Sequence, residues 1–145
     1  MQVASTLLSI ALSMQGTDVP NASAERAQWL HRGVQVGTTY YPVALFVPSL
    51  PAPSDGYPVL LFLHGSGERG NDGEAQTRSG LGPYLGAHGE EFPAITVFPQ
   101  APADSDWSGD QSAAALAAIE LVEQEFPVDA DRIYLTGMSR GGYGV

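Results

Sequence analysis

Short apolar runs and one helical pattern, separated by turn-forming residues, organise most of this 145-residue chain. The unbroken run at residues 59–63 (VLLFL) predicts a strand that is buried on both faces. Residues 94–98 and 132–136 predict two further strands. Between them, apolar residues recur with a 3.6-residue period over residues 110–126, which predicts a helix. Strands that alternate with crossover segments in this way are typical of a parallel sheet.

The part before the first buried run predicts a hairpin. Residues 34–36 and 39–47 have the pattern of two antiparallel strands joined by a tight turn at Gly37. Proline has no N–H to donate, so Pro42 predicts that the second strand lies at an edge of the sheet. Residues 75–88 are expected to hold the first crossover helix, although glycines and prolines interrupt their pattern. The overall prediction is an α/β domain with a mostly parallel sheet and an antiparallel N-terminal hairpin.

Residues 25–145 are expected to belong to a single domain, and residues 1–24 to precede it. Residues 3–14 are apolar over the length of a signal-peptide core, and Ala22-Ser23-Ala24 offers a small-x-small cleavage site. The absence of a basic residue before Arg26 weighs against secretion. Residues 1–24 are therefore predicted to be a signal peptide or another N-terminal extension. The first reading implies a secreted or periplasmic protein, and the second a cytoplasmic one.

Composition narrows the chemistry and the partners. A formal net charge of −10 would repel nucleic-acid phosphates and anionic lipid headgroups, so nucleic acid is not expected as a partner. The apolar run at residues 3–14 is too short to span a bilayer, so stable membrane insertion is not expected either. All six basic residues are arginine, which excludes Schiff-base and Walker-type lysines. The chain also has no cysteine, which excludes a thiol nucleophile and a cysteine metal site.

Gly137-Met138-Ser139-Arg140-Gly141 matches the pattern G-x-S-x-G and directly follows a predicted strand. In this pattern the serine occupies a strained turn between strand and helix, where larger flanking residues would clash with neighbouring backbone. The hydroxyl then projects clear of the sheet. Ser139 is therefore predicted to be a catalytic nucleophile.

A second motif, His64-Gly65-Ser66-Gly67, directly follows the buried strand at residues 59–63. A loop in this position supplies one donor of an oxyanion hole, and the residue after the nucleophile supplies the other. We therefore predict that the backbone N–H groups of Ser66 and Arg140 stabilise the developing oxyanion. His64 is expected to hydrogen-bond its own loop and not to transfer protons. Trp107 is predicted to be either a core residue or part of a substrate pocket.

Two other motifs match cofactor-binding patterns only in part, one for a dinucleotide and one for calcium. Gly65, Gly67 and Gly70 fit the dinucleotide fingerprint G-x-G-x-x-G, but Asn71-Asp72-Gly73 continues as a solvated turn where a helix should open. Residues 104–109 resemble the start of a calcium-binding loop that lacks its final glutamate, and they are expected instead to cap the following helix. No nucleotide, metal or other cofactor is therefore expected.

The motifs together resemble those of α/β-hydrolase superfamily serine esterases. Within that superfamily the chain is most similar to the phospholipase/carboxylesterase, dienelactone-hydrolase-like and polyhydroxybutyrate-depolymerase-like "predicted peptidase" group. The resemblance extends over residues 34–145 and rests on residues 61–70 (LFLHGSGERG), 98–102 (FPQAP) with Trp107, and 131–143 (DRIYLTGMSRGGY). It implies that Ser139 is the nucleophile and that the substrate is a small-molecule or polysaccharide-linked carboxylic ester.

In this fold the catalytic triad runs Ser, Asp/Glu, His along the chain. His31, His64 and His88 all precede Ser139, so the acid and the base are expected beyond residue 145. The prediction is therefore the N-terminal part of an α/β-hydrolase domain, truncated after the nucleophile elbow and inactive alone. The alternatives are a catalytically inert fragment that needs its missing half and a dinucleotide-binding βαβ unit at residues 65–70.

Overall fold

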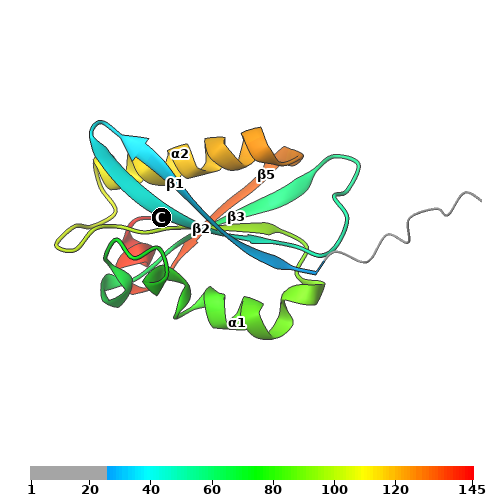
Figure 1. The fold of residues 1–145 in the computed structure, drawn as a ribbon, viewed down its shortest axis with the longest axis horizontal. Helices are drawn as coiled ribbons and strands as arrows, with labels where there is room; N and C mark the ends of the chain where they lie inside the picture. The colour runs from blue at the N-terminus through cyan, green and yellow to red at the C-terminus, as the bar shows by residue number, and fades with distance from the viewer. Residues whose placement is uncertain (1–25) are drawn as a thin grey trace, which may run out of the picture.

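The computed structural model describes residues 26–145, so the predicted N-terminal extension at residues 1–24 lies outside the described residues. These residues form one five-stranded sheet with the strand order β1-β2-β4-β3-β5. Helices α1 and α2 cover opposite faces of this sheet (Figure 1). The elements are β1 (Gln28–Val36), β2 (Thr39–Val47), β3 (Tyr57–Leu63), α1 (Leu81–His88), β4 (Ile95–Pro99), α2 (Asp110–Glu125) and β5 (Val128–Gly137), with short 3-10 helices η1 (Ser66–Glu68), η2 (Ala75–Thr77), η3 (Gly89–Glu91) and η4 (Ser139–Tyr143).

The predicted mixture of parallel and antiparallel strands is confirmed. Strands β4, β3 and β5 are parallel neighbours, whereas β1 and β2 form an antiparallel hairpin that joins the sheet through β2 and β4. The central strand β3 is packed on both faces. Leu61 and Leu63 belong to the core on the α2 side, and Phe62 packs on the other face with Leu85 of α1. This double burial explains why the run at residues 59–63 contains no polar residue.

The prediction that Pro42 marks an edge strand is wrong. Strand β2 is interior, and the edges of the described sheet are β1 and β5. The pairing of β2 with β4 begins only at Val43, opposite Pro99, so Pro42 lies just outside that ladder. The missing N–H of Pro42 therefore costs no hydrogen bond in the β2–β4 ladder. The Pro42 carbonyl accepts a hydrogen bond of 2.9 Å from the Gln100 N–H.

The first crossover is less helical than predicted. Residues 75–88 contain the short η2 and the eight-residue α1, which are separated at Gly80. Gly80 has a φ of 62°, a conformation that glycine adopts readily and that interrupts a right-handed helix. None of the helices within residues 26–145 is long and apolar enough to cross a membrane.

Candidate active site

Ser139 lies at the junction between β5 and η4, as its motif predicts. Its φ of 53° places it in the left-handed region, which serine enters only at an energetic cost. Its side chain is exposed, and its hydroxyl forms no hydrogen bond with any other group of residues 26–145. The turn is anchored just before the serine, where the Met138 N–H donates to the Leu63 carbonyl over 3.0 Å. The hydroxyl is thus exposed and unpaired within the described residues.

Two glycines make this turn sterically feasible. A Cβ atom on Gly141 would lie 1.9 Å from the carbonyl oxygen of Leu63, and one on Gly137 would lie 2.3 Å from that of Gly141. Both distances are far below any tolerable contact, and both involve backbone atoms that cannot move aside easily. Gly141 is therefore required by the close approach of the elbow to the end of β3, and Gly137 by the tight turn of the elbow upon itself.

The loop after β3 lies directly beside the elbow. Leu63 is opposite Gly137 in the parallel β3–β5 pairing, so the C-terminal ends of both strands meet at one edge of the sheet. A Cβ atom on Gly65 would lie 3.4 Å from the Ser139 Cβ. The Arg140 Nε also donates a hydrogen bond of 3.1 Å to the Ser66 Oγ. The two motifs, distant in sequence, therefore form one site.

Unpaired backbone donors accompany the serine. Within residues 26–145, neither the Ser66 N–H nor the Arg140 N–H donates a hydrogen bond. Backbone amides that are held in place but left unpaired are the groups that stabilise an oxyanion during acyl transfer. The arrangement has the donors that such chemistry needs.

A cleft of about 490 Å³ opens in front of Ser139. Trp107 lines it and is also a buried member of the core on the α2 side, which confirms the predicted core role, whereas its part in a substrate pocket stays a prediction. Its indole N–H donates to the His64 carbonyl over 2.9 Å, which fixes the ring. The other residues that line the cleft are Ser66, Asp106, Ser108, Ser139, Arg140, Tyr143 and Gly144.

His64 is buried and serves its own loop, as the sequence predicts. Its Nε2 accepts a hydrogen bond of 3.0 Å from the Ala101 N–H, so that nitrogen carries no proton. Its Nδ1 lies 2.7 Å from the Gly65 carbonyl and therefore donates to it. Burial lowers the pKa of this imidazole, which keeps the ring neutral. Both nitrogens are thus engaged in holding the loop.

The other two described histidines lie elsewhere in the fold. His31 belongs to β1, at the edge of the described sheet opposite β5. His88 ends α1 and stacks on Tyr84, with the ring centroids 4.7 Å apart. No histidine within residues 26–145 is hydrogen-bonded to Ser139.

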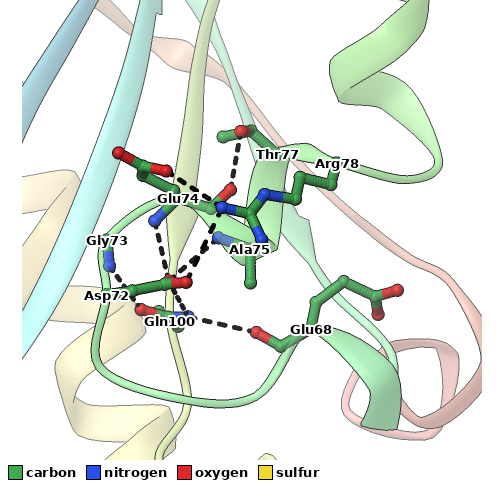
Figure 2. A network of polar contacts seen from close by, with 8 residues as sticks. All are labelled: Glu68, Asp72, Gly73, Glu74, Ala75, Thr77, Arg78 and Gln100. Atoms are coloured by element: carbon green, nitrogen blue, oxygen red, sulfur yellow. Dashed lines mark hydrogen bonds and ion pairs between the residues drawn. The ribbon is translucent and has the colours of Figure 1, made fainter.

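The solvated turn expected at Asn71, Asp72 and Glu74 is confirmed, since all three residues are exposed, but Asp72 also has a structural role that was not predicted. The Asp72 carboxylate accepts hydrogen bonds from two backbone N–H groups and from the side chain of the buried Gln100 (Figure 2). The sequence pattern predicted no individual role for Gln100. The available signal was a glutamine placed directly after a buried apolar strand, where an unpartnered amide would be costly.

Arg69 is a second residue whose role the sequence analysis missed. Its Nε donates to the Ser66 carbonyl and its Nη1 to the Ser105 carbonyl, each over 3.0 Å. One side chain thus joins the loop after β3 to the segment that leads into α2. Its only sequence signal was its place within the motif at residues 61–70.

The expected capping by residues 104–109 is also wrong. Helix α2 begins after Gly109, which has a φ of 56°, and no side chain caps it. The Ser108 hydroxyl donates to the Asp106 carboxylate instead, and the N-cap position itself is Gly109, which has no side chain to accept a hydrogen bond. Among residues 26–145 no group of three or more His, Asp or Glu side chains could hold a metal ion.

The local structure does not favour the dinucleotide alternative. Strand β3 is followed by the three-residue η1 and by further turns, and the next α-helix begins only at Leu81. A pyrophosphate site requires a helix N-terminus directly after the glycines, and none begins there.

Neither a family model nor a curated protein matches this sequence. Solved structures do match it. A thermostable esterase has a TM-score of 0.68 and 32% identity, with 80% of this chain and 35% of that chain covered. A ferulic acid esterase has a TM-score of 0.58 and 18% identity, with 82% and 52% covered.

An S-formylglutathione hydrolase from Staphylococcus aureus is also similar, with a TM-score of 0.56, 17% identity, and 83% of this chain and 50% of that chain covered. The present chain therefore spans between about a third and a half of the length of these proteins. The strand order, the parallel core and these likenesses agree. The chain has the α/β-hydrolase fold, and within that fold it resembles the esterases.

Proposed function

We propose that the chain carries the nucleophile and the oxyanion hole of a serine hydrolase that acts on carboxylic esters. The observation that supports this most is the conformation of Ser139. A non-glycine residue at a φ of 53° costs conformational energy. Such strain clusters at active sites, so a strained serine with a free hydroxyl between a strand and a helix supports a catalytic role. The unpaired N–H groups of Ser66 and Arg140 beside it match the needs of acyl transfer.

In this proposal the Ser139 Oγ attacks the ester carbonyl carbon and its proton passes to a general base. The Ser66 and Arg140 N–H groups stabilise the negative charge on the carbonyl oxygen of the tetrahedral intermediate. Collapse of that intermediate breaks the bond to the alcohol, which leaves with the proton held by the base. Water then attacks the acyl-enzyme in the same way and releases the acid.

The general base is proposed to come from sequence that follows residue 145. Both nitrogens of His64 are engaged, and the other described histidines lie elsewhere in the fold. The matched esterases are two to three times as long as the part that this chain covers, which leaves room for an Asp/Glu and a His. We accordingly propose that residues 1–145 alone have negligible activity.

The cleft supports a short acyl ester as the substrate, either as a small molecule or linked to a polysaccharide. Its volume of about 490 Å³ suits a small ligand, and Trp107 and the exposed Tyr143 offer aromatic surfaces for stacking. We also propose export of the protein on the strength of residues 3–14 and the site at residues 22–24.

The test compares the complete enzyme, residues 1–145 alone and two serine variants in hydrolysis of p-nitrophenyl acetate. Ser139→Ala should abolish turnover by the complete enzyme and its labelling by a fluorophosphonate. Ser54→Ala, which changes an exposed serine outside the cleft, is the matched control and should keep both. Full activity of Ser139→Ala would contradict the proposed nucleophile. Turnover by residues 1–145 that is lost in Ser139→Ala would show that a base within those residues suffices.

A further inference from the structure

Gln100 is a polar side chain in the core of the molecule. It directly follows β4 and is only 1% exposed. Its backbone N–H donates to Pro42 in β2, so its main chain is fixed to the sheet. Its side chain leaves the sheet and enters the loop after β3 (Figure 2).

All three hydrogen bonds of the Gln100 side chain go to that loop. Its Nε2 donates to the Glu68 carbonyl over 3.2 Å and to the Asp72 Oδ1 over 2.8 Å. Its Oε1 accepts from the Gly73 N–H over 2.8 Å. Rotation of the amide by half a turn would bring its oxygen against two acceptors, so only one orientation is compatible with the loop. A glutamine is required here because a carboxylate could not donate.

Asp72 completes the arrangement from the exposed side. Besides the bond from Gln100, its Oδ1 accepts from the Glu74 and Ala75 N–H groups, each over 3.0 Å. These bonds, first from Ala75 and Glu74 and then from Gln100, lower the pKa of the carboxyl to about 2. Asp72 is therefore an anion throughout the neutral range and a constant acceptor for Gln100.

The network continues to Ser66. Glu68, whose carbonyl Gln100 binds, ends the single 3-10 turn that Ser66 begins. Two further hydrogen bonds hold the loop after β3. The Gly70 N–H donates to the Ala101 carbonyl, and the Arg69 Nε donates to the Ser66 carbonyl. Both ends of the turn are thus tied to neighbouring segments, which sets the direction of the Ser66 N–H.

We infer that Gln100 and Asp72 are positioning residues that hold the Ser66 N–H where the oxyanion develops. This inference rests on the proposed function. Neither residue touches the reacting atoms, and both act through the loop. Oxyanion stabilisation depends on donors that are fixed before the reaction. A loosened loop should therefore destabilise the transition state more than it lowers the affinity for the substrate.

The test uses the complete enzyme with Gln100→Met, Asp72→Ala and Asp72→Asn. Gln100→Met keeps the length of the side chain and removes all three hydrogen bonds, and Asp72→Ala removes the anchor. Both should lower kcat by roughly 10- to 100-fold and leave KM within about 2-fold. Asp72→Asn retains an acceptor oxygen and should recover most of kcat.

Glu74→Gln is the matched control in the same loop. The Glu74 side chain pairs with Arg78 at the surface, so kcat should not change in this variant.

A trifluoromethyl ketone supplies an independent readout, since its tetrahedral adduct carries an oxyanion. Its affinity should fall in parallel with kcat in Gln100→Met and Asp72→Ala. A purely structural role would lower the amount of folded enzyme and leave the kcat per labelled Ser139 unchanged, which would overturn the inference. Should Gln100→Met fail to fold, the Asp72 variants decide. Loss of activity in Ser139→Ala together with unchanged kcat in the Asp72 variants would refute only the positioning role, whereas full activity of Ser139→Ala would refute the proposed function.

Discussion

The two segments that meet at the candidate site are held in different ways. The elbow after β5 depends on close backbone contact, with Gly137 and Gly141 against neighbouring carbonyls and Ser139 in a strained conformation. The loop after β3 depends on side-chain hydrogen bonds, chiefly those of Gln100 and Arg69. The elbow should therefore tolerate no added atom at Gly137 or Gly141, whereas the loop should tolerate added atoms where there is space and should fail when a hydrogen bond is lost.

The largest expected effect is that of Gly141→Ala. The added methyl would meet the Leu63 carbonyl at 1.9 Å, and relief would require β3 and β5 to separate. We expect a loss of about 3 kcal/mol or more in the free energy of unfolding, or failure to fold. Gly142→Ala is the matched control, because its nearest neighbour is at 3.5 Å, an ordinary contact. Urea denaturation measures both, and equal stability of the two variants would refute the steric account of the elbow.

A smaller effect of opposite sign is expected at the nucleophile. Ser139→Gly should relieve the cost of a φ of 53°, which is about 1 to 2 kcal/mol for a residue with a Cβ. Part of this gain is offset because glycine makes the unfolded chain more flexible. We therefore expect Ser139→Gly to exceed Ser139→Ala in stability by roughly 0.5 to 1 kcal/mol. A glycine variant no more stable than the alanine variant would show that the turn is unstrained.

The hydrogen bonds of Asp72 in the loop after β3 should make the stability of the protein depend on pH. The pKa of Asp72 is about 2 in the folded protein against 3.8 for the free side chain, so the unfolded state binds more protons between these values. The stability that Asp72 contributes is complete above about pH 4 and is lost as the pH falls towards 2. Thermal unfolding at a series of pH values should show the advantage of the parent over Asp72→Asn shrinking across this window. An advantage independent of pH would contradict the assignment.

The smallest effect is expected for Gly67→Ala. No atom lies within 4 Å of a Cβ built on Gly67, and its φ is not in the left-handed region. The free energy of unfolding should therefore change by no more than about 0.5 kcal/mol. A loss comparable to that of Gly141→Ala would show that the loop, too, is held by steric contact.

The features that the sequence predicted well are local. The apolar run of β3, the period of α2 and the glycines that flank Ser139 each lie within a few consecutive residues. The errors concern features that depend on distant partners. The interior position of β2 follows from its pairing with β4, and the bond between Gln100 and Asp72 joins residues 28 apart. No periodicity along the chain encodes either contact.

The parallel pairing of β3 with β5 has a consequence for how the protein folds. The Ser66 and Arg140 side chains that meet across the site are 74 residues apart, and the β4 segment lies between them in sequence. Closing so long a loop costs entropy before any contact compensates for it, and this slows folding. The hairpin of β1 and β2, by contrast, closes locally and can form early. The cleft should therefore appear late on the folding pathway, and a folding intermediate built around the hairpin would have no cleft at all.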